Sequence, residues 1–291
     1  MYMKSAVVAG NGPSLAEIDY SLLPDDYDVF RCNQFYFEDK YFLGKKVKYA
    51  FLNFSVILEQ YFTYKTLDTN NEYSIENIVI SRLAEASTDK KYQGFKYYFP
   101  DIKDGYDLYI SKLELFNCFL KFNNLYKGNY ITSGVYMVAV AVALGYKNIY
   151  IAGIDFYEDS NNSYVFNHQK SNFIKVFPKI KRLVKNGIHN KNFDIEALRF
   201  LEENYDINIV SLCPKSSFSK YFPCTYPDIK DNSKEFVIVE KPYEAIKDIL
   251  IPIERAYLIT GYNISIFKRI NSKARRYFKS LLHQLVLFIK F

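Results

Sequence analysis

Apolar positions fall in short blocks along the chain, and segments with helical periodicity separate several of these blocks. A short apolar run bounded by glycine or polar turn residues predicts a buried strand. On this basis we expect strands at Lys4–Ala9, Tyr27–Asn33, Val47–Asn53, Asn77–Ser81, Asn148–Gly153 and Ile207–Cys213.

Two other segments have the pattern of helices. Asn192–Tyr205 repeats its apolar side chains at helical spacing, which predicts an amphipathic helix. A more apolar segment follows Thr132 and Ser133, either of which can cap its start, and Gly145 would end it just before a strand. Alternation of apolar strands with helices predicts an α/β fold with a mostly parallel sheet flanked by helices.

Residues 155–188 interrupt this alternation with a polar segment rich in asparagine and lysine. A long insertion between a strand and a helix of a compact domain is more often a functional lid than filler. We therefore expect one α/β domain built from residues 1–154 and 189–255, with 155–188 as a small lid insertion.

Residues 256–291 form a tail with helical spacing of apolar side chains and basic residues on the other face. The whole chain of 291 residues has a net charge of +6, and the tail contributes seven basic and no acidic residues, so the remainder carries −1. This pattern is typical of an interfacial helix on an anionic membrane surface. The alternative is a helix that packs on the body or on a partner subunit.

Composition narrows the classes of function. A nucleic-acid-binding protein would carry its basic residues on the folded body, so we expect no nucleic-acid partner. The four cysteines form no C-x-x-C pair, which argues against a zinc site and favours free thiols. The sequence has no signal-peptide pattern, and its longest apolar run, Val135–Gly145, is too short to span a bilayer. We expect a cytoplasmic protein attached peripherally to the inner face of the cytoplasmic membrane.

Uncharged polar residues gather where the predicted strands end. Gly10, Asn11 and Gly12 end the first strand, and an asparagine ends each of the next two, Asn33 and Asn53. Because ligands bind at the carboxyl ends of parallel strands, these residues predict a nucleotide site with a sugar-binding rim. Pro13 would begin a short helix whose free N–H groups favour an anion. Each of these residues taken alone is also compatible with an ordinary turn.

Two other features bear on the chemistry. Asp26-Tyr27-Asp28 has the D-x-D spacing of metal-dependent glycosyltransferases, but it precedes its strand and should lie at the opposite edge of the sheet. Histidine is scarce: His168 lies in the lid, His283 in the tail, and His189 at the junction of the lid with the next helix. A lone loop histidine is more often incidental, but this location makes His189 a candidate for general acid–base chemistry.

Several long blocks in this order resemble the bacterial lipooligosaccharide sialyltransferases of glycosyltransferase family 42. They are AGNGPSL, DVFRCNQFYFEDKYFLGKK, ITSGVYMVAVAVALGYKNIYIAGIDFY, DIEALRFLE and KDILIP, which together cover about residues 4–255. The resemblance implies a variant GT-A nucleotide-sugar fold with a small lid. It also implies inverting, metal-independent transfer of sialic acid from CMP-sialic acid to galactose (α2,3) or to terminal sialic acid (α2,8) of a cell-surface lipooligosaccharide.

The same resemblance implies roles for individual residues. His189 would be the general base, and Tyr157 and Tyr164 would donate hydrogen bonds to the departing phosphate. Substrate contacts would come from Gly10, Asn11, Gly12, Asn33, Asn53, Thr132, Ser133, Gly153, Asp155 and Phe156. No cofactor and no metal are expected, and a homotetramer is a further expectation. One departure is Tyr130, which stands where an arginine is expected and leaves the preferred acceptor open.

Two other functions fit the residues without the resemblance. A nucleotide-dependent methyltransferase or oxidoreductase would share a site at the strand ends, although no acidic residue ends the second strand to hold a ribose. A membrane-tethered nucleotide-sugar-binding protein without transfer activity is the non-enzyme alternative.

Overall fold

The computed structural model describes residues 5–83, 96–156, 164–167, 171–176, 190–224 and 236–260. The chain separates into two compact units. The first contains residues 1–86 and 101–251, and the second contains 87–100 and 252–291. The sheet and every candidate site residue that the structure describes belong to the first unit.

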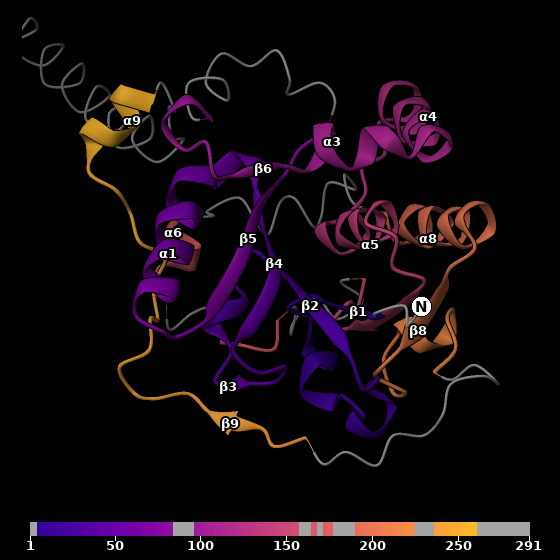
Figure 1. Cartoon of the computed structure of the whole chain (residues 1–291), viewed down its shortest axis with the longest axis horizontal. Helices are drawn as coiled ribbons and strands as arrows, with labels where there is room; N and C mark the ends of the chain where they lie inside the picture. The colour runs from indigo at the N-terminus through magenta and orange to yellow at the C-terminus, as the bar shows by residue number, and fades with distance from the viewer. Residues whose placement is uncertain are drawn as a thin grey trace, which may run out of the picture. The chain divides into compact units, whose positions relative to one another are not determined.

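A seven-stranded sheet forms the centre of the first unit, in the order β6-β5-β4-β2-β1-β7-β8, and every pairing between its neighbours is parallel (Figure 1). Its strands are β1 (Ser5–Ala9), β2 (Tyr27–Cys32), β4 (Lys46–Asn53), β5 (Ser74–Ser81), β6 (Lys103–Asp104), β7 (Asn148–Ala152) and β8 (Asn208–Ser211). The expected α/β fold with a mostly parallel sheet is confirmed.

Side chains from successive strand positions enter two different apolar cores, as the alternation of a pleated strand requires. Ala6 and Val8 of β1 point into the larger core, whereas Val7 and Ala9 enter the smaller one. The larger core lies under helices α4 (Glu114–Phe122), α5 (Ser133–Ala143) and α8 (Lys191–Tyr205). Helices α5 and α8 contact each other and lie side by side in Figure 1. Burial on both faces explains why the central strands β1 and β7 are almost uniformly apolar.

The two helices expected from the sequence are present. Thr132 is the N-cap of α5, and Gly145 has a positive φ of 89° just after its end. Helix α8 begins after Asn190, whose side chain accepts a hydrogen bond from the backbone N–H of Asn192. The apolar spacing and the caps therefore located both helices to within a residue or two.

Other elements gave weaker signals in the sequence. Helix α1 (Ile57–Thr69) contacts β4 and β5, and a two-stranded antiparallel sheet joins β3 (Lys40–Tyr41) to β9 (Val239–Glu240). The other helices among the described residues are short: α3 (Gly105–Leu108), α6 (Phe173–Val176) and α9 (Glu254–Thr260). The described residues also include short 3-10 or π-helical segments: η1 (Pro13–Glu17), η2 (Tyr20–Leu22), η3 (Phe35–Phe37), η4 (Phe54–Val56), η6 (Ile110–Lys112), η7 (Asn123–Lys127) and η9 (Phe218–Lys220).

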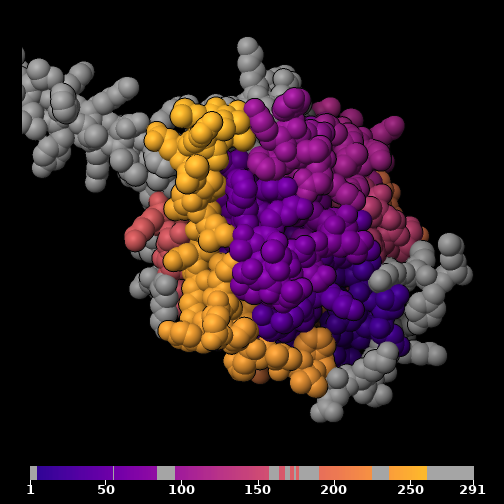
Figure 2. Space-filling view, turned by 60° about the vertical axis from the view of Figure 1, so that its left-hand side comes forward, coloured from indigo at the N-terminus to yellow at the C-terminus, as the bar shows by residue number. Residues whose placement is uncertain are grey.

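Residues 236–251 cross the surface as an extended segment, which we call the strap. Figure 2 shows it in orange and yellow along the indigo and purple N-terminal part of the first unit. Lys241 of the strap donates from Nζ to the carbonyl of Tyr36, and the N–H of Ile246 donates to Glu72 at 2.9 Å. In the part of the chain that the structure describes, no helix is long and apolar enough to cross a membrane.

Candidate functional site

We call the carboxyl ends of the neighbouring strands β1 and β7, together with the residues that follow them, the β1–β7 crevice. The chain builds the sheet outward from β1 in one direction and then returns to its other side with β7, which is the topological switch point where α/β sheets bind ligands. The two strand ends touch through glycine backbone. The N–H of Gly12 donates to the carbonyl of Gly153 at 2.8 Å, and a Cβ on Gly10 would lie 2.3 Å from that same oxygen. Glycine is therefore required at Gly10 for this approach.

The short helix after Gly12 differs from the expectation. Pro13 does begin η1, a 3-10 helix, but the N–H of Ser14 donates to the carboxylate of Asp155 at 3.0 Å. Asp155 thus already occupies the position at which we expected this helix to bind an anion. The prediction of a free anion site at Pro13 was wrong, because a carboxylate distant in sequence caps the helix.

Asn11 follows the end of β1 and contacts both β2 and the segment around Val165. Its Nδ2 donates to the carbonyl of Cys32 at 3.0 Å, and its backbone carbonyl accepts from the N–H of Val165 at 2.9 Å. Its buried Oδ1 has no hydrogen-bond partner among the described residues. A buried acceptor of this kind is costly unless a ligand or water satisfies it.

Asn33 and Ser133 meet although 100 residues separate them. Nδ2 of Asn33 donates to Oγ of Ser133 at 3.2 Å, which joins the end of β2 to the start of α5. Asn33 adopts the left-handed conformation (φ 54°), and its carbonyl accepts from the hydroxyl of Tyr64 at 2.7 Å. Asparagine tolerates this conformation better than most residues, which explains its place in the turn.

Three further polar groups at this edge were missed by the sequence reasoning. Gln60 accepts the backbone N–H of Asn53 at 2.7 Å, so its amide lies beside the end of β4. The Nε2 atoms of Gln34 and Gln60 and the Oγ of Ser81 are buried and have no hydrogen-bond partner within the described ranges. Gln34 directly follows Asn33, and Ser81 pairs with Asn53 in the sheet register. Position near a strand end was the only available signal for Gln34 and Ser81, and Gln60, which lies in α1, had none.

The start of α5 is held by a buried carboxylate. Asp194 accepts the backbone N–H of Thr132 at 3.0 Å and is 2 % exposed. Burial raises the pKa of Asp194 to about 7, partly offset by the hydrogen bonds from Thr132. Thr132 and Ser133 therefore face the site from a fixed helix terminus.

The ring of Phe156 points away from the crevice. Phe156 stacks on Phe218 with centroids 5.6 Å apart and is buried in the larger core. Its backbone has a positive φ of 52°. Any contact of Phe156 with a nucleotide would therefore come from the main chain.

Tyr164 lies in an aromatic cluster next to the crevice. Its ring stacks on Phe166 at 5.1 Å and meets Phe173 edge-on at 5.5 Å, and Phe166 contacts Phe37. Val165, the next residue, donates to Asn11 as described above. Residues 164–167 of the predicted lid therefore contact the chain just after β1.

The other residues considered in the sequence analysis either lie away from the site or are not among the residues that the structure describes. Tyr157, His168, His189 and the tail beyond Thr260 are not among the described residues. Tyr27 and Asp28 begin β2, so the D-x-D stretch lies at the amino edge of the sheet, as expected.

Burial raises the pKa values of Cys32 and Cys213 to about 12, which keeps both thiols protonated and poor as nucleophiles.

Uncharged amides, hydroxyls and backbone groups thus dominate the crevice. Within the described residues, no group of three or more His, Cys, Asp or Glu side chains could hold a metal ion. The arrangement can bind a ligand rich in hydroxyl and acyl groups, because amides both donate and accept.

Comparison with known proteins decides the family. The model of the alpha-2,3-sialyltransferase (CST-I) family matches residues 4–288. The chain belongs to this family. The resemblance to glycosyltransferase family 42 that the motifs indicated is thereby confirmed, and the alternatives of a methyltransferase, an oxidoreductase or a non-catalytic binding protein are set aside.

Solved structures agree with the family. The chain is similar to the Campylobacter jejuni sialyltransferase CstII in complex with the substrate analogue CMP-3FNeuAc, at 47% identity and a TM-score of 0.82, covering 90% of this chain and 100% of that one. It is also similar to the monofunctional alpha-2,3-sialyltransferase Cst-I of the same organism, at 40% identity and a TM-score of 0.82, covering 94% and 95%.

An uncharacterised protein of Haemophilus influenzae is 37% identical over 195 residues, which are 66% of this chain and 82% of that protein.

The similarity to the CstII structure confirms the GT-A-like fold that we expected for this chain.

Proposed function

We propose that this sialyltransferase moves sialic acid from CMP-sialic acid to a terminal galactose of a cell-surface lipooligosaccharide in α2,3 linkage, with inversion and without a divalent metal ion. Transfer to a terminal sialic acid in α2,8 linkage is the second reaction to test. The observation that carries the proposal is the row of buried, unsatisfied amide and hydroxyl groups along the carboxyl edge of the sheet.

Two solved structures of one relative support the identities of the substrates. CstII was solved with CMP-3FNeuAc, and a CST-II structure contains a trisaccharide acceptor and CMP. In this chain the ribose and phosphate would lie next to Gly10, Asn11 and Gly12, and Gly153, Asp155 and Phe156 would frame the cytidine. The sialic acid would lie toward Asn33 and Asn53, with Thr132 and Ser133 near its carboxylate. We add Gln34 and Gln60 to these donors, because each has a buried amide nitrogen to satisfy.

Metal independence is argued from the leaving group. The sialyl donor ionises toward an oxocarbenium ion while negative charge grows on a single phosphate. Hydroxyl donors from Tyr157 and Tyr164 can stabilise that charge in a closed site, so the demand for a divalent cation is weak. A neutral His189 would take the proton of the acceptor hydroxyl as it attacks the opposite face, because the imidazole pKa lies near working pH.

The test is product analysis with a lactoside and a sialyl-lactoside as acceptors, each in EDTA and in buffer with added magnesium. We expect a sialylated lactoside at equal rates in both buffers and an α2,3 linkage by linkage-specific sialidase digestion. A rate that falls in EDTA and recovers with magnesium would contradict metal independence. Product from sialyl-lactoside would establish the second linkage, and its absence would make the enzyme monofunctional.

His189 has its own variant test. We expect His189→Ala to bind CMP with near wild-type affinity by calorimetry but to lose transfer by a factor of about 10² to 10⁴, the usual contribution of a general base. His168→Ala, at the histidine within the lid sequence, is the matched control and should keep its activity. Transfer by His189→Ala at a rate near that of wild type would refute the assignment.

A further inference from the structure

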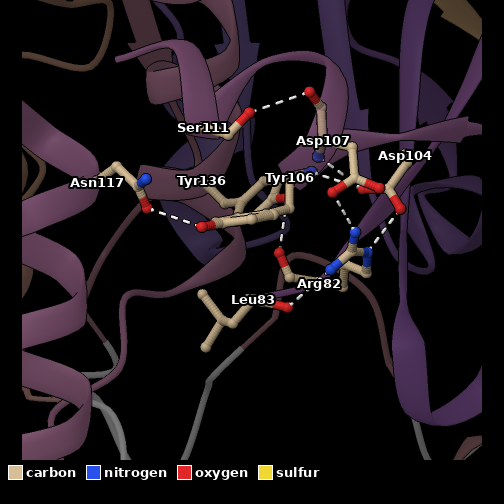
Figure 3. A network of polar contacts seen from close by, with 8 residues as sticks. All are labelled: Arg82, Leu83, Asp104, Tyr106, Asp107, Ser111, Asn117 and Tyr136. Carbon is tan, nitrogen blue, oxygen red and sulfur yellow. Dashed lines mark hydrogen bonds and ion pairs between the residues drawn. The ribbon is translucent and has the colours of Figure 1, made fainter. Parts of the chain in front are cut away.

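A network of buried charges lies at the carboxyl edge of the sheet, beyond the residues assigned to the donor (Figure 3). Arg82 directly follows β5, and its Nε pairs with Oδ2 of Asp104 at 2.6 Å. Both side chains are fully buried. Arg82 also pairs through Nη2 with the half-exposed Asp107 at 2.5 Å, and its guanidinium lies 5.2 Å from the ring centre of Tyr106.

Asp104 does two things in this network. Its Oδ2 binds Arg82, and its Oδ1 accepts the backbone N–H groups of Tyr106 and Asp107, both at 2.9 Å. It therefore caps α3 while it pairs with the arginine. A carboxylate that is shared in this way holds the start of α3 against the end of β5.

The network also fixes the main chain after β5. Nη1 of Arg82 donates to the carbonyl of Leu83 at 3.1 Å, and the carbonyl of Arg82 accepts the hydroxyl of Tyr136 at 2.8 Å. Tyr136 belongs to the first turn of α5, since its N–H donates to the carbonyl of Thr132 at 3.0 Å. The end of β5 is thus tied to the helix whose start carries Thr132 and Ser133.

Backbone and side chains are closely packed where β5, α3 and α5 meet. A Cβ on Gly105 would lie 2.7 Å from the carbonyl oxygen of Ile80 and 2.7 Å from the hydroxyl of Tyr136. Strand β5, helix α3 and helix α5 therefore meet at one point. A shift of the Arg82 main chain must move the others with it.

The order of the strand ends indicates which substrate would lie next to this junction. Along the carboxyl edge the sequence of ends is β7, β1, β2, β4 and β5. The nucleotide would occupy the first two and the sialic acid would face Asn33 and Asn53 at the next two. The buried hydroxyl of Ser81 pairs in register with Asn53 and comes just before Arg82. The end of β5 is then the next surface that an acceptor sugar would meet.

We propose that Arg82, held by Asp104 and Asp107, is a positioning residue that fixes the backbone of Ser81–Leu83 as the acceptor-facing edge of the site. This rests on the proposed function, because it takes the donor's place along the sheet from that function. The ligand it serves is the terminal, hydroxyl-rich sugar of the acceptor. Arg82 itself touches neither substrate.

The test separates acceptor from donor kinetics in the full chain. Arg82→Lys keeps the charge but loses the planar fork that reaches Asp104, Asp107 and Leu83 together. We expect its KM for a lactoside to rise about tenfold or more, as small displacements of a positioned substrate do. The KM for CMP-sialic acid and the rate of donor hydrolysis without acceptor should stay within about twofold of wild type.

Tyr136→Phe is the second variant and keeps the packing of α5. It removes only the hydroxyl that binds the Arg82 carbonyl, so we expect a smaller rise of the acceptor KM. Combined with Arg82→Lys, its effect should be less than additive, since both act on one junction.

Arg31→Lys is the matched control. Among the described residues, Arg31 forms a second fully buried ion pair, with Glu38 at 2.8 Å. It should lose stability to a similar degree while its acceptor KM stays unchanged. The proposal is overturned if Arg82→Lys raises the acceptor KM no more than Arg31→Lys does, or if donor and acceptor parameters fall in parallel. Failure of the proposed function would instead appear in the wild type, as absence of transfer to the lactoside.

Discussion

At the scale of single residues, Asp194 has a measurable signature in the pH dependence of stability. Its pKa is raised by burial from 3.8 to about 7 in the folded state. The folded protein therefore binds a proton more tightly than the unfolded chain, and stability falls as pH rises through this window. The raised pKa corresponds to a loss of about 4 kcal/mol by pH 8, an upper bound for a carboxylate that keeps its hydrogen bonds.

We expect Asp194→Asn to flatten this dependence. The amide keeps an oxygen to accept the N–H of Thr132 but carries no charge. Urea unfolding from pH 5 to 8.5 should show the free energy of unfolding falling in wild type and remaining level in the variant. Asp206→Asn, an exposed aspartate at the end of the same helix, is the control and should follow the wild type. Parallel curves for wild type and Asp194→Asn would contradict the buried titration.

At the scale of elements, the strap links the lid to the body. Asn172, just before α6, exchanges two hydrogen bonds with the main chain of Ile249, from Nδ2 at 2.7 Å and to Oδ1 at 2.9 Å. The next strap residue, Leu250, donates to Thr63 of α1 at 2.9 Å. Phe173 follows Asn172 and packs against Tyr164. The strap therefore binds the segment that carries Phe173, one member of the aromatic cluster around Tyr164.

We expect Asn172→Ala to lower stability by about 1–2 kcal/mol, because it removes two partly buried hydrogen bonds. It should also lower kcat several-fold while the donor KM changes little, since Tyr164 would be less well placed. Thermal unfolding and steady-state kinetics measure the two effects. The control is Asn208→Ala, whose amide bonds Asn148 on the exposed surface at 2.9 Å. Unchanged kcat in Asn172→Ala would show that the strap has only a structural role.

At the scale of the whole molecule, the distribution of charge along the chain predicts which residues would attach the protein to a membrane. All seven basic residues of the tail lie beyond Thr260. Each basic residue near an anionic bilayer contributes about 1 kcal/mol, and this attraction is screened by salt. The proposed membrane attachment should therefore depend on residues 261–291.

We expect a chain that ends at Thr260 to transfer sialic acid to a soluble lactoside but to lose flotation with vesicles that contain an anionic lipid. The full chain should float with them at low salt, less well at high salt, and not with neutral vesicles. If the full chain fails to float, while truncation changes its size on gel filtration, the tail serves the proposed homotetramer instead. Loss of lactoside transfer on truncation would contradict a role restricted to attachment.

The accuracy of the sequence-based predictions varied with the range of the interaction involved. The helices at Ser133–Ala143 and Lys191–Tyr205 were predictable because apolar spacing and caps are local. The placement of Asn33 at the carboxyl edge and of Asp28 at the opposite edge followed from the direction of one strand. Gln34, Gln60 and Ser81 were missed, since nothing in the local sequence marks a buried amide or hydroxyl that lacks a partner.

By itself, the sequence determined the alternation of strands and helices, the glycine and asparagine strand ends, and the family to which those motifs belong. Only the tertiary structure decided the order of the strands and the contacts made across it. Asp155 caps the helix after Gly12 from 141 residues away, and Asp194 holds Thr132 from 62 residues away. Local pattern specifies each element because neighbouring residues share one backbone conformation. Contacts at such distances depend on how the elements pack, and a periodicity of apolar residues does not encode which polar partners will meet.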